Sequence, residues 1–258
     1  MGKFYSTVND SFKVFLENPK FIVPKLVMAV FYSVIILLTA DLSMLVFEAP
    51  GEELLMPALI LLVVTFAVGI LDIFVGSMYP FMVSQVKKNQ ALHLRNAAKS
   101  AIEKAPLTLP SVLLVEVAFM VLLLIISLPL SFLILSDDAF FLLTMGVYAV
   151  VLVAIVFFFY LLYPVMVYEK QSIVGSLKRS IGLSMKNKSG IGKATVISLL
   201  LSLLSYALAF SIEIFPQGAD EIFFWLAFII VRVLTAYLYS YLFVLNPVFY
   251  LNYVKAAK

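Results

Sequence analysis

"LLMPALILLVVTFAVGILDIFVGSMYPFMVSQVKK", residues 54–88, is an apolar run in which Asp72 is the only charge before the closing lysine pair. A helix needs roughly 20 mostly apolar residues to cross a hydrocarbon core of about 30 Å, so this stretch predicts a transmembrane helix. It is too long and too uniformly apolar to be one of the roughly ten-residue alternating strands of an outer-membrane barrel. The stretch therefore favours a helical membrane protein.

Other stretches along the chain have the same character. Hydrophobic residues make up 64% of the sequence, charged residues 13%, and the mean hydropathy is +1.10, far from the balance of a soluble domain. The predicted class is an all-α polytopic membrane protein with six transmembrane helices. These spans lie near 21–47, 54–86, 107–135, 140–168, 191–215 and 221–253.

The connections between the spans separate by charge. Three short ones, "FEAPGEE" from 47, "SDDAF" from 136 and "FPQGADE" from 215, carry acidic residues and no Lys or Arg. All but one of the 18 Lys and Arg residues lie in the other connections, at the ends of the chain or at the neighbouring span ends. By the positive-inside rule, the sequence predicts a multi-pass protein of the cytoplasmic (inner) membrane with both termini in the cytoplasm.

A short phrase recurs at the predicted cytoplasmic ends of alternate spans. "YPFMVSQVKK" begins at Tyr79, "YPVMVYEKQS" begins at Tyr163, and "NPVFY" begins at Asn246. We expect each Tyr-Pro pair to form a corner at the membrane interface, with the tyrosine hydroxyl in water.

The recurrence also predicts internal duplication. The proposed units are 4–86, 91–168 and 172–254, each an amphipathic helix followed by a transmembrane hairpin, in a pseudo-threefold arrangement. The alternative is that any six-helix protein with short outer connections looks roughly repetitive.

The three amphipathic segments, at about 4–17, 91–104 and 172–186, combine apolar stripes with Lys and Arg. That composition is typical of helices in a membrane interface, although the segments would equally suit a cap on the helix bundle. Their basic residues would attract anionic headgroups. The predicted partners are membrane lipids, including anionic ones, together with an unidentified protein partner; no nucleic acid is expected.

Two segments carry a resemblance to a known group. "YPVMVYEKQSIV" from 163 leads into "GSLKRSIGLSMKNKSG" at 175–190, and "SFKVFLENPKFIVPKL" covers 11–26. These resemble a widespread group of prokaryotic six-helix membrane proteins of unknown function, which includes the membrane domain attached to some glycerophosphodiester phosphodiesterases. The resemblance implies a membrane module, and it transfers no catalytic residue of the phosphodiesterase.

Three ionisable residues fall inside predicted spans at comparable depth: Arg232, Asp72 and Glu116. A charge at the centre of a membrane helix costs about 2.5–3.5 kcal/mol on insertion scales, so it usually faces a partner or water. We expect Arg232 to bond Asp72 or Glu116. The cluster is either a ligand site, with Arg232 contacting an anion, or a structural charge group that fixes helix register.

Catalytic and metal sites are not predicted. The chain has no cysteine and one histidine, His93, in a basic segment, which excludes thiolate chemistry and leaves little for a zinc site. We expect no cofactor and no enzymatic activity, although a carboxylate-based lipid enzyme stays open.

The function hypothesis is binding or transport of a lipid-like or small anionic molecule in a polar intramembrane cavity. The alternative is a non-enzymatic membrane scaffold or assembly partner that contacts lipids through its cytoplasmic amphipathic helices.

Overall fold

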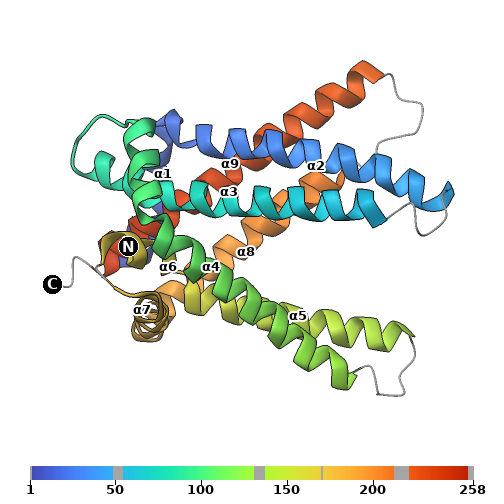
Figure 1. Ribbon diagram of the computed structural model, residues 1–258. Coiled ribbons are helices and arrows are strands. Elements are labelled where there is room, and N and C mark those ends of the chain that lie inside the picture. The colour runs from blue at the N-terminus through green and yellow to red at the C-terminus, as the bar shows by residue number, and fades with distance from the viewer. Residues whose placement is uncertain (1, 49–54, 131–136, 170, 212–220, 255–258) are drawn as a thin grey trace.

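The computed structural model describes residues 2–48, 55–130, 137–169, 171–211 and 221–254 (Figure 1). Most of these residues are helical and none forms a strand, which confirms the all-α class. In chain order the helices are α1 (Lys3–Leu16), the short 3-10 helix η1 (Pro19–Phe21), α2 (Val23–Glu48), α3 (Leu55–Lys87), α4 (Leu94–Leu130), α5 (Asp137–Phe159), α6 (Leu162–Tyr168), α7 (Ile173–Lys186), α8 (Lys188–Ser211) and α9 (Glu221–Tyr253).

Six stretches of the described chain are long and apolar enough to cross a membrane, which confirms the predicted number. They are Pro19–Ile36, Met56–Lys87, Leu94–Leu130, Ala139–Tyr168, Lys188–Ser211 and Ile222–Tyr253. Large apolar side chains such as Leu62, Leu142 and Leu203 are exposed on these helices, as expected for surfaces that face hydrocarbon. Most of "FEAPGEE" and "FPQGADE" falls outside the described residues, whereas α5 begins within "SDDAF" at Asp137.

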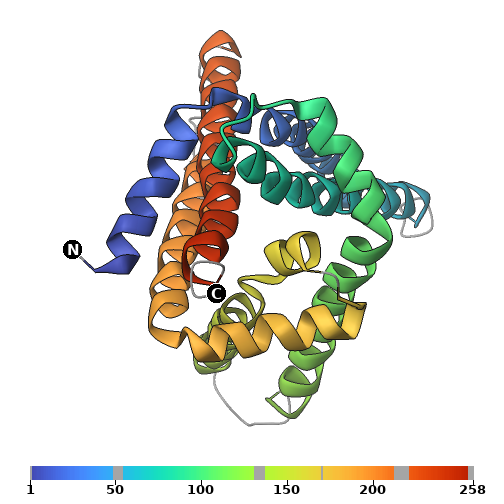
Figure 2. The same cartoon turned by 90° about the vertical axis from the view of Figure 1, so that its left-hand side faces the viewer.

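The long helices converge at one end and spread apart at the other. In Figure 1 the hairpins α2–α3, α4–α5 and α8–α9 diverge toward the right, away from both termini. We call the converging end, which carries α1, the first turns of α4, and α7, the basic end. Figure 2 looks onto it and shows these three helices toward its outside. Its inside holds the packed core, including Phe15, Phe21, Val83, Val165 and Phe249.

Two predicted boundaries differ from the structure. The amphipathic segment at 91–104 is not a separate helix, because α4 runs from Leu94 through Pro106 and Pro110 into the membrane. Each proline removes one backbone donor, and the first carbonyl affected belongs to exposed Ile102, at the end of the span where water is available.

The predicted span 140–168 is instead divided into α5 and α6. Pro164 cannot donate to the Tyr160 carbonyl, and the Asn246 side-chain amide donates to it instead. The hydroxyls of Ser180 and Ser184 in α7 donate to the neighbouring Phe158 carbonyl. The chain break is therefore stabilised by side chains from two other helices. The division into units 4–86, 91–168 and 172–254 stays a prediction.

The expectation for the Tyr-Pro corners is wrong at Tyr79. Pro80 lies inside α3, and the Tyr79 side chain is 0% exposed rather than wet at an interface. Its single O–H proton faces two acceptors, the Phe21 carbonyl at 2.9 Å and Ser240 Oγ at 3.2 Å. The reason is that Tyr79 lies where α3, η1 and α9 meet, so the core supplies the hydroxyl's partners instead of water.

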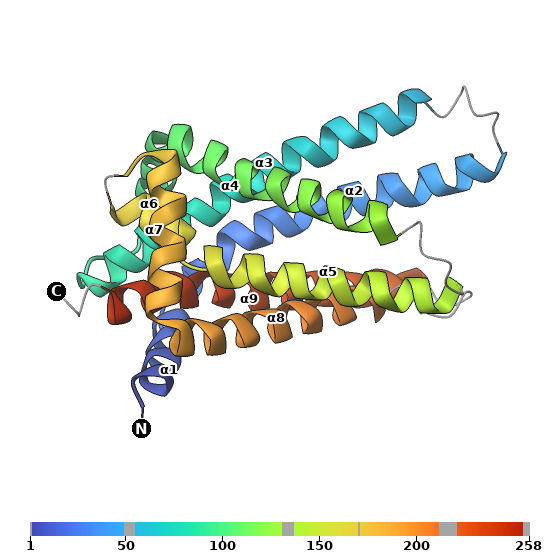
Figure 3. The ribbon, with the colours of Figure 1, turned by 90° about the horizontal axis from the view of Figure 1, so that it is seen from below.

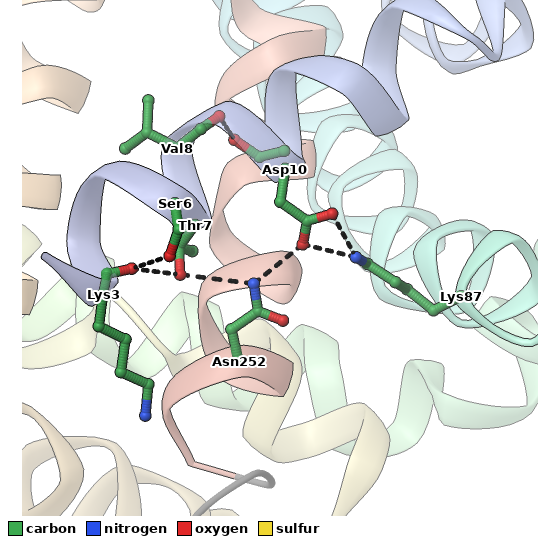
Figure 4. Close-up of polar contacts among 8 residues, drawn as sticks. Lys3, Ser6, Thr7, Val8, Asp10, Lys87 and Asn252 are labelled. Atoms are coloured by element: carbon green, nitrogen blue, oxygen red, sulfur yellow. Dashed lines mark hydrogen bonds and ion pairs between the residues drawn. The ribbon is translucent and has the colours of Figure 1, made fainter. Parts of the chain in front are cut away.

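A polar cluster holds α1 on the bundle (Figure 4). The Asp10 carboxylate pairs with Nζ of Lys87, the last residue of α3, at 2.5 Å. It also accepts a hydrogen bond of 2.9 Å from Nδ2 of Asn252, near the end of α9. One acidic side chain thus joins the first described helix to two helix ends far along the chain.

Candidate functional site

A pocket of about 350 Å³ lies between α2, α3, α8 and α9. This volume is near the lower end of the range for small-molecule sites. The residues that line the pocket are Lys25, Met28, Ala29, Tyr32 and Ile36 of α2, Asp72 of α3, Ser205, Tyr206 and Ala209 of α8, and Arg232, Thr235, Ala236 and Tyr239 of α9.

One end of the pocket holds an ion pair between a buried lysine and a partly exposed aspartate. Lys25 Nζ lies 2.6 Å from Asp72 Oδ1, and Lys25 is only 6% exposed although it sits near the start of α2. Aromatic rings complete the surroundings of the ammonium group, with the Phe243 centroid at 4.1 Å and the Tyr239 centroid at 6.0 Å. Asp72 neutralises this cation, so the pair adds no net charge to the pocket.

Arg232 is the second cation of the pocket, and no carboxylate of the described residues pairs with it. Its Nε is buried and has no hydrogen-bond partner among the described residues. The guanidinium carbon lies 4.9 Å from the centroid of the Phe228 ring, one helical turn away. The Thr235 hydroxyl, on the same face of α9, is likewise buried without a partner. These are polar groups that usually find a partner when buried.

The two charged parts of the pocket are separated along the bundle. Tyr239, which contacts the Lys25 ammonium, follows Arg232 by two helical turns, or about 10 Å along α9. The pocket therefore extends from a neutral Lys25–Asp72 pair to an uncompensated arginine, with one net positive charge between them. Such an arrangement can bind an anionic group at Arg232 and an apolar or hydroxyl-bearing body beside it.

The predicted pairing of Arg232 is wrong. Asp72 lines the same pocket as Arg232, but its carboxylate is engaged by Lys25. Glu116 lies on α4 with an exposed side chain, does not line this pocket, and forms no ion pair within the described chain. Counting residues along each span predicts the depth of the three residues. It does not predict how each helix is rotated about its axis, and therefore which neighbour each side chain faces.

Lys25 is a pocket residue that sequence reasoning missed, because it was counted only among the basic residues that mark the predicted cytoplasmic side. Helical periodicity could have indicated that Lys25 faces the pocket. Lys25, Ala29, Tyr32 and Ile36 recur at spacings of three and four residues, which place them on one face of a helix. Arg232, Thr235 and Tyr239 form a matching face on α9.

The pocket reaches the outer surface of the bundle at α8. Tyr206 lines it and is 68% exposed, on a helix whose Leu203 and Phe210 are also exposed. This surface has the apolar composition of a lipid-facing helix, so the pocket borders a surface suited to face lipid.

Neither a metal centre nor a family assignment emerges for this site. No group of three or more His, Cys, Asp or Glu side chains that could hold a metal ion occurs among the described residues. Comparison of the chain with protein-family models, curated proteins and solved structures finds no match.

Proposed function

We propose that this membrane protein binds, and in its working cycle moves, a lipid-like or small anionic molecule in the pocket beside Arg232. The single observation that carries the proposal is the unpaired Arg232 Nε in a pocket large enough for a ligand. Keeping an arginine at mid-membrane depth costs about 2.5–3.5 kcal/mol, which favours an anion or water as its partner. The proposed anion fills that role without an enzymatic step.

The alternative scaffold function gives the charges a purely structural role. In that case each buried cation should have a carboxylate partner that fixes helix register. Lys25 meets this expectation through Asp72, whereas Arg232 does not. The binding function is therefore the one we favour.

Replacing Arg232 with alanine is expected to remove a ligand that co-purifies with the wild-type protein at fixed stoichiometry. The charge-assisted hydrogen bonds to the anion contribute roughly 1.5–3 kcal/mol each, so their loss weakens binding by about tenfold or more. Native mass spectrometry of gently extracted protein measures the bound mass directly. Arg232→Lys keeps the charge and should retain part of the binding.

The matched control is Arg95→Ala, which removes an exposed arginine of α4 that does not line this pocket. All variants are compared at equal thermal stability, so that unfolding does not imitate ligand loss. If the Arg232→Ala protein keeps the same bound molecule as wild type, or if both carry only an identical unspecific lipid ladder, the ligand site is refuted and the scaffold function moves ahead.

We further propose that the basic end faces the cytoplasm, with both termini inside. The asymmetry of Lys and Arg between the connections supports this orientation. Fusions of a reporter that fluoresces only in the cytoplasm should be bright after residue 258 and after residue 89, and dark within 49–54. A phosphatase reporter that is active only outside the cytoplasm should give the opposite pattern. Bright fluorescence from fusions within 49–54 would reverse the orientation.

A further inference from the structure

Helices α1 and α7 use the same register to pack on the bundle, although they lie far apart in the sequence. The buried face of α1 includes Thr7, Ser11, Val14 and Phe15, and that of α7 includes Ser176, Ser180, Leu183 and Ser184. Both faces have successive spacings of four, three and one residues. The two helices therefore present corresponding sides to the rest of the protein.

Each helix also carries an exposed apolar stripe, and the stripes too are in register. We name them the α1 stripe, which is Tyr5, Phe12 and Leu16, and the α7 stripe, which is Val174, Ile181 and Met185. Both have spacings of seven and four residues, and their six side chains are between 36% and 62% exposed.

The stripes begin about 100° around each helix from the buried faces, and Tyr5 and Val174 lie opposite buried Val14 and Leu183. Phe12 and Leu16 directly follow buried Ser11 and Phe15, and one residue turns an α-helix by about 100°. Ile181 and Met185 follow buried Ser180 and Ser184 in the same way. An apolar arc therefore extends from the bundle contact around the neighbouring side of each helix.

The remaining side of both helices is polar and exposed. It carries Lys13 on α1 and Lys186 on α7, whereas Asn9 and Lys178 are exposed at the border of the stripes, because each lies three and four residues from two stripe members. The basic groups that hold the helix assembly together are different ones, since Arg179 pairs with Glu169 at 3.0 Å and Lys87 pairs with Asp10. Lys178 and Lys186 form no ion pair in the part of the chain that the structure describes. They are available to an external anion.

The helices also have the orientation that an interfacial helix requires. In Figure 3, α7 crosses the directions of α5, α8 and α9 steeply instead of running along them, and α1 does so as well. Both lie at the basic end, where the spans leave the membrane. The spans that follow them begin with exposed apolar residues, including Val23 and Val27 of α2 and Val196 of α8. The stripes thus lie at the level where the lipid-facing surface begins.

From these observations we infer that α1 and α7 lie in one membrane leaflet, with both stripes inserted among the acyl chains and Lys178 and Lys186 bound to anionic headgroups. The occupant is a lipid surface, because an apolar side next to a basic side matches the layering of acyl chain and headgroup. This inference concerns the basic end of the bundle and does not depend on a ligand at Arg232.

The insertion is tested with single tryptophans in vesicles of phosphatidylcholine and phosphatidylglycerol that carry bromine on the acyl chains. Trp225 is the only tryptophan of the chain, so a Trp225→Phe background is silent. We expect Phe12→Trp and Ile181→Trp to be quenched several-fold more strongly than Lys13→Trp and Lys186→Trp, which probe exposed polar positions farther around each helix. Equal quenching at stripe and polar positions would overturn the inference. Weak quenching at the stripe positions would overturn it too, because a protein partner or a second copy would then cover the stripes.

The headgroup selectivity is tested with the Ile181→Trp protein and a small fraction of brominated lipid. Brominated phosphatidylglycerol should quench more than brominated phosphatidylcholine at equal fraction. Lys178→Gln and Lys186→Gln should each reduce this preference by about fivefold, the factor that corresponds to one lysine near a charged surface. Quenching that is the same for both lipids, or a preference that survives the double substitution, would rule out the anionic-headgroup contact.

Discussion

Replacing Asp72 with alanine is expected to lower the free energy of unfolding by about 3–5 kcal/mol, the usual effect of leaving a buried charge without its partner. Lys25 is 6% exposed and its ammonium lies 2.6 Å from the Asp72 carboxylate. Aromatic rings occupy much of its remaining surroundings, and they cannot replace an anion. Denaturant or thermal unfolding in detergent micelles measures the difference.

The control is the Asp10–Lys87 pair, in which both side chains are about one third exposed. Water and salt screen such a pair, so Asp10→Ala should cost only about 1 kcal/mol. Combining Lys25→Met with Asp72→Leu removes both charges, and this double variant should regain most of the lost stability. If Asp72→Ala costs no more than Asp10→Ala, the Lys25 ammonium reaches water and is not buried.

The number of spans was predictable because the thickness of a bilayer sets the length of an apolar run directly. The residues at which the helices begin and end were harder to predict. Prolines suggested helix boundaries, yet Pro80 and Pro106 lie inside helices while a break precedes Pro164. At the break before Pro164, the freed Tyr160 carbonyl has another donor. At Tyr160 that donor is Asn246, which lies 86 residues away and could not be assigned from local sequence.

The charged site was predictable only in part, because residue counting gives the depth of a side chain and not its direction. Counting residues along a helix gives the depth of Arg232 and Asp72, and both indeed line one pocket. It does not give the direction in which each side chain points, so Glu116 was grouped with them while Lys25 was assigned to topology. The same limit applies to Tyr79, whose preference for an interface was overridden by partners in the core.

Glycine 76 marks the closest approach of helices around this site, and Gly76→Ala is expected to lower the free energy of unfolding by about 1–3 kcal/mol. A Cβ at this position would lie 2.8 Å from Phe243 Cε1 and 3.0 Å from the Tyr163 hydroxyl. Phe243 has little freedom to move away, because its ring packs 5.3 Å from that of Tyr79 and also contacts the Lys25 ammonium. Overpacking here therefore disturbs both the core and the pocket wall.

Gly69 provides a matched control two turns earlier on the same helix. A Cβ at Gly69 meets nothing within 4 Å, so Gly69→Ala should change stability in the opposite direction, by up to about 1 kcal/mol from helix propensity. Unfolding of both variants under identical conditions measures the contrast. Two equal effects would mean that α3 and α9 are farther apart at Gly76 than the structure has them. In that case the wall that brings Phe243 to Lys25 would be displaced, and the Lys25–Asp72 pair would lose the aromatic contacts that enclose it.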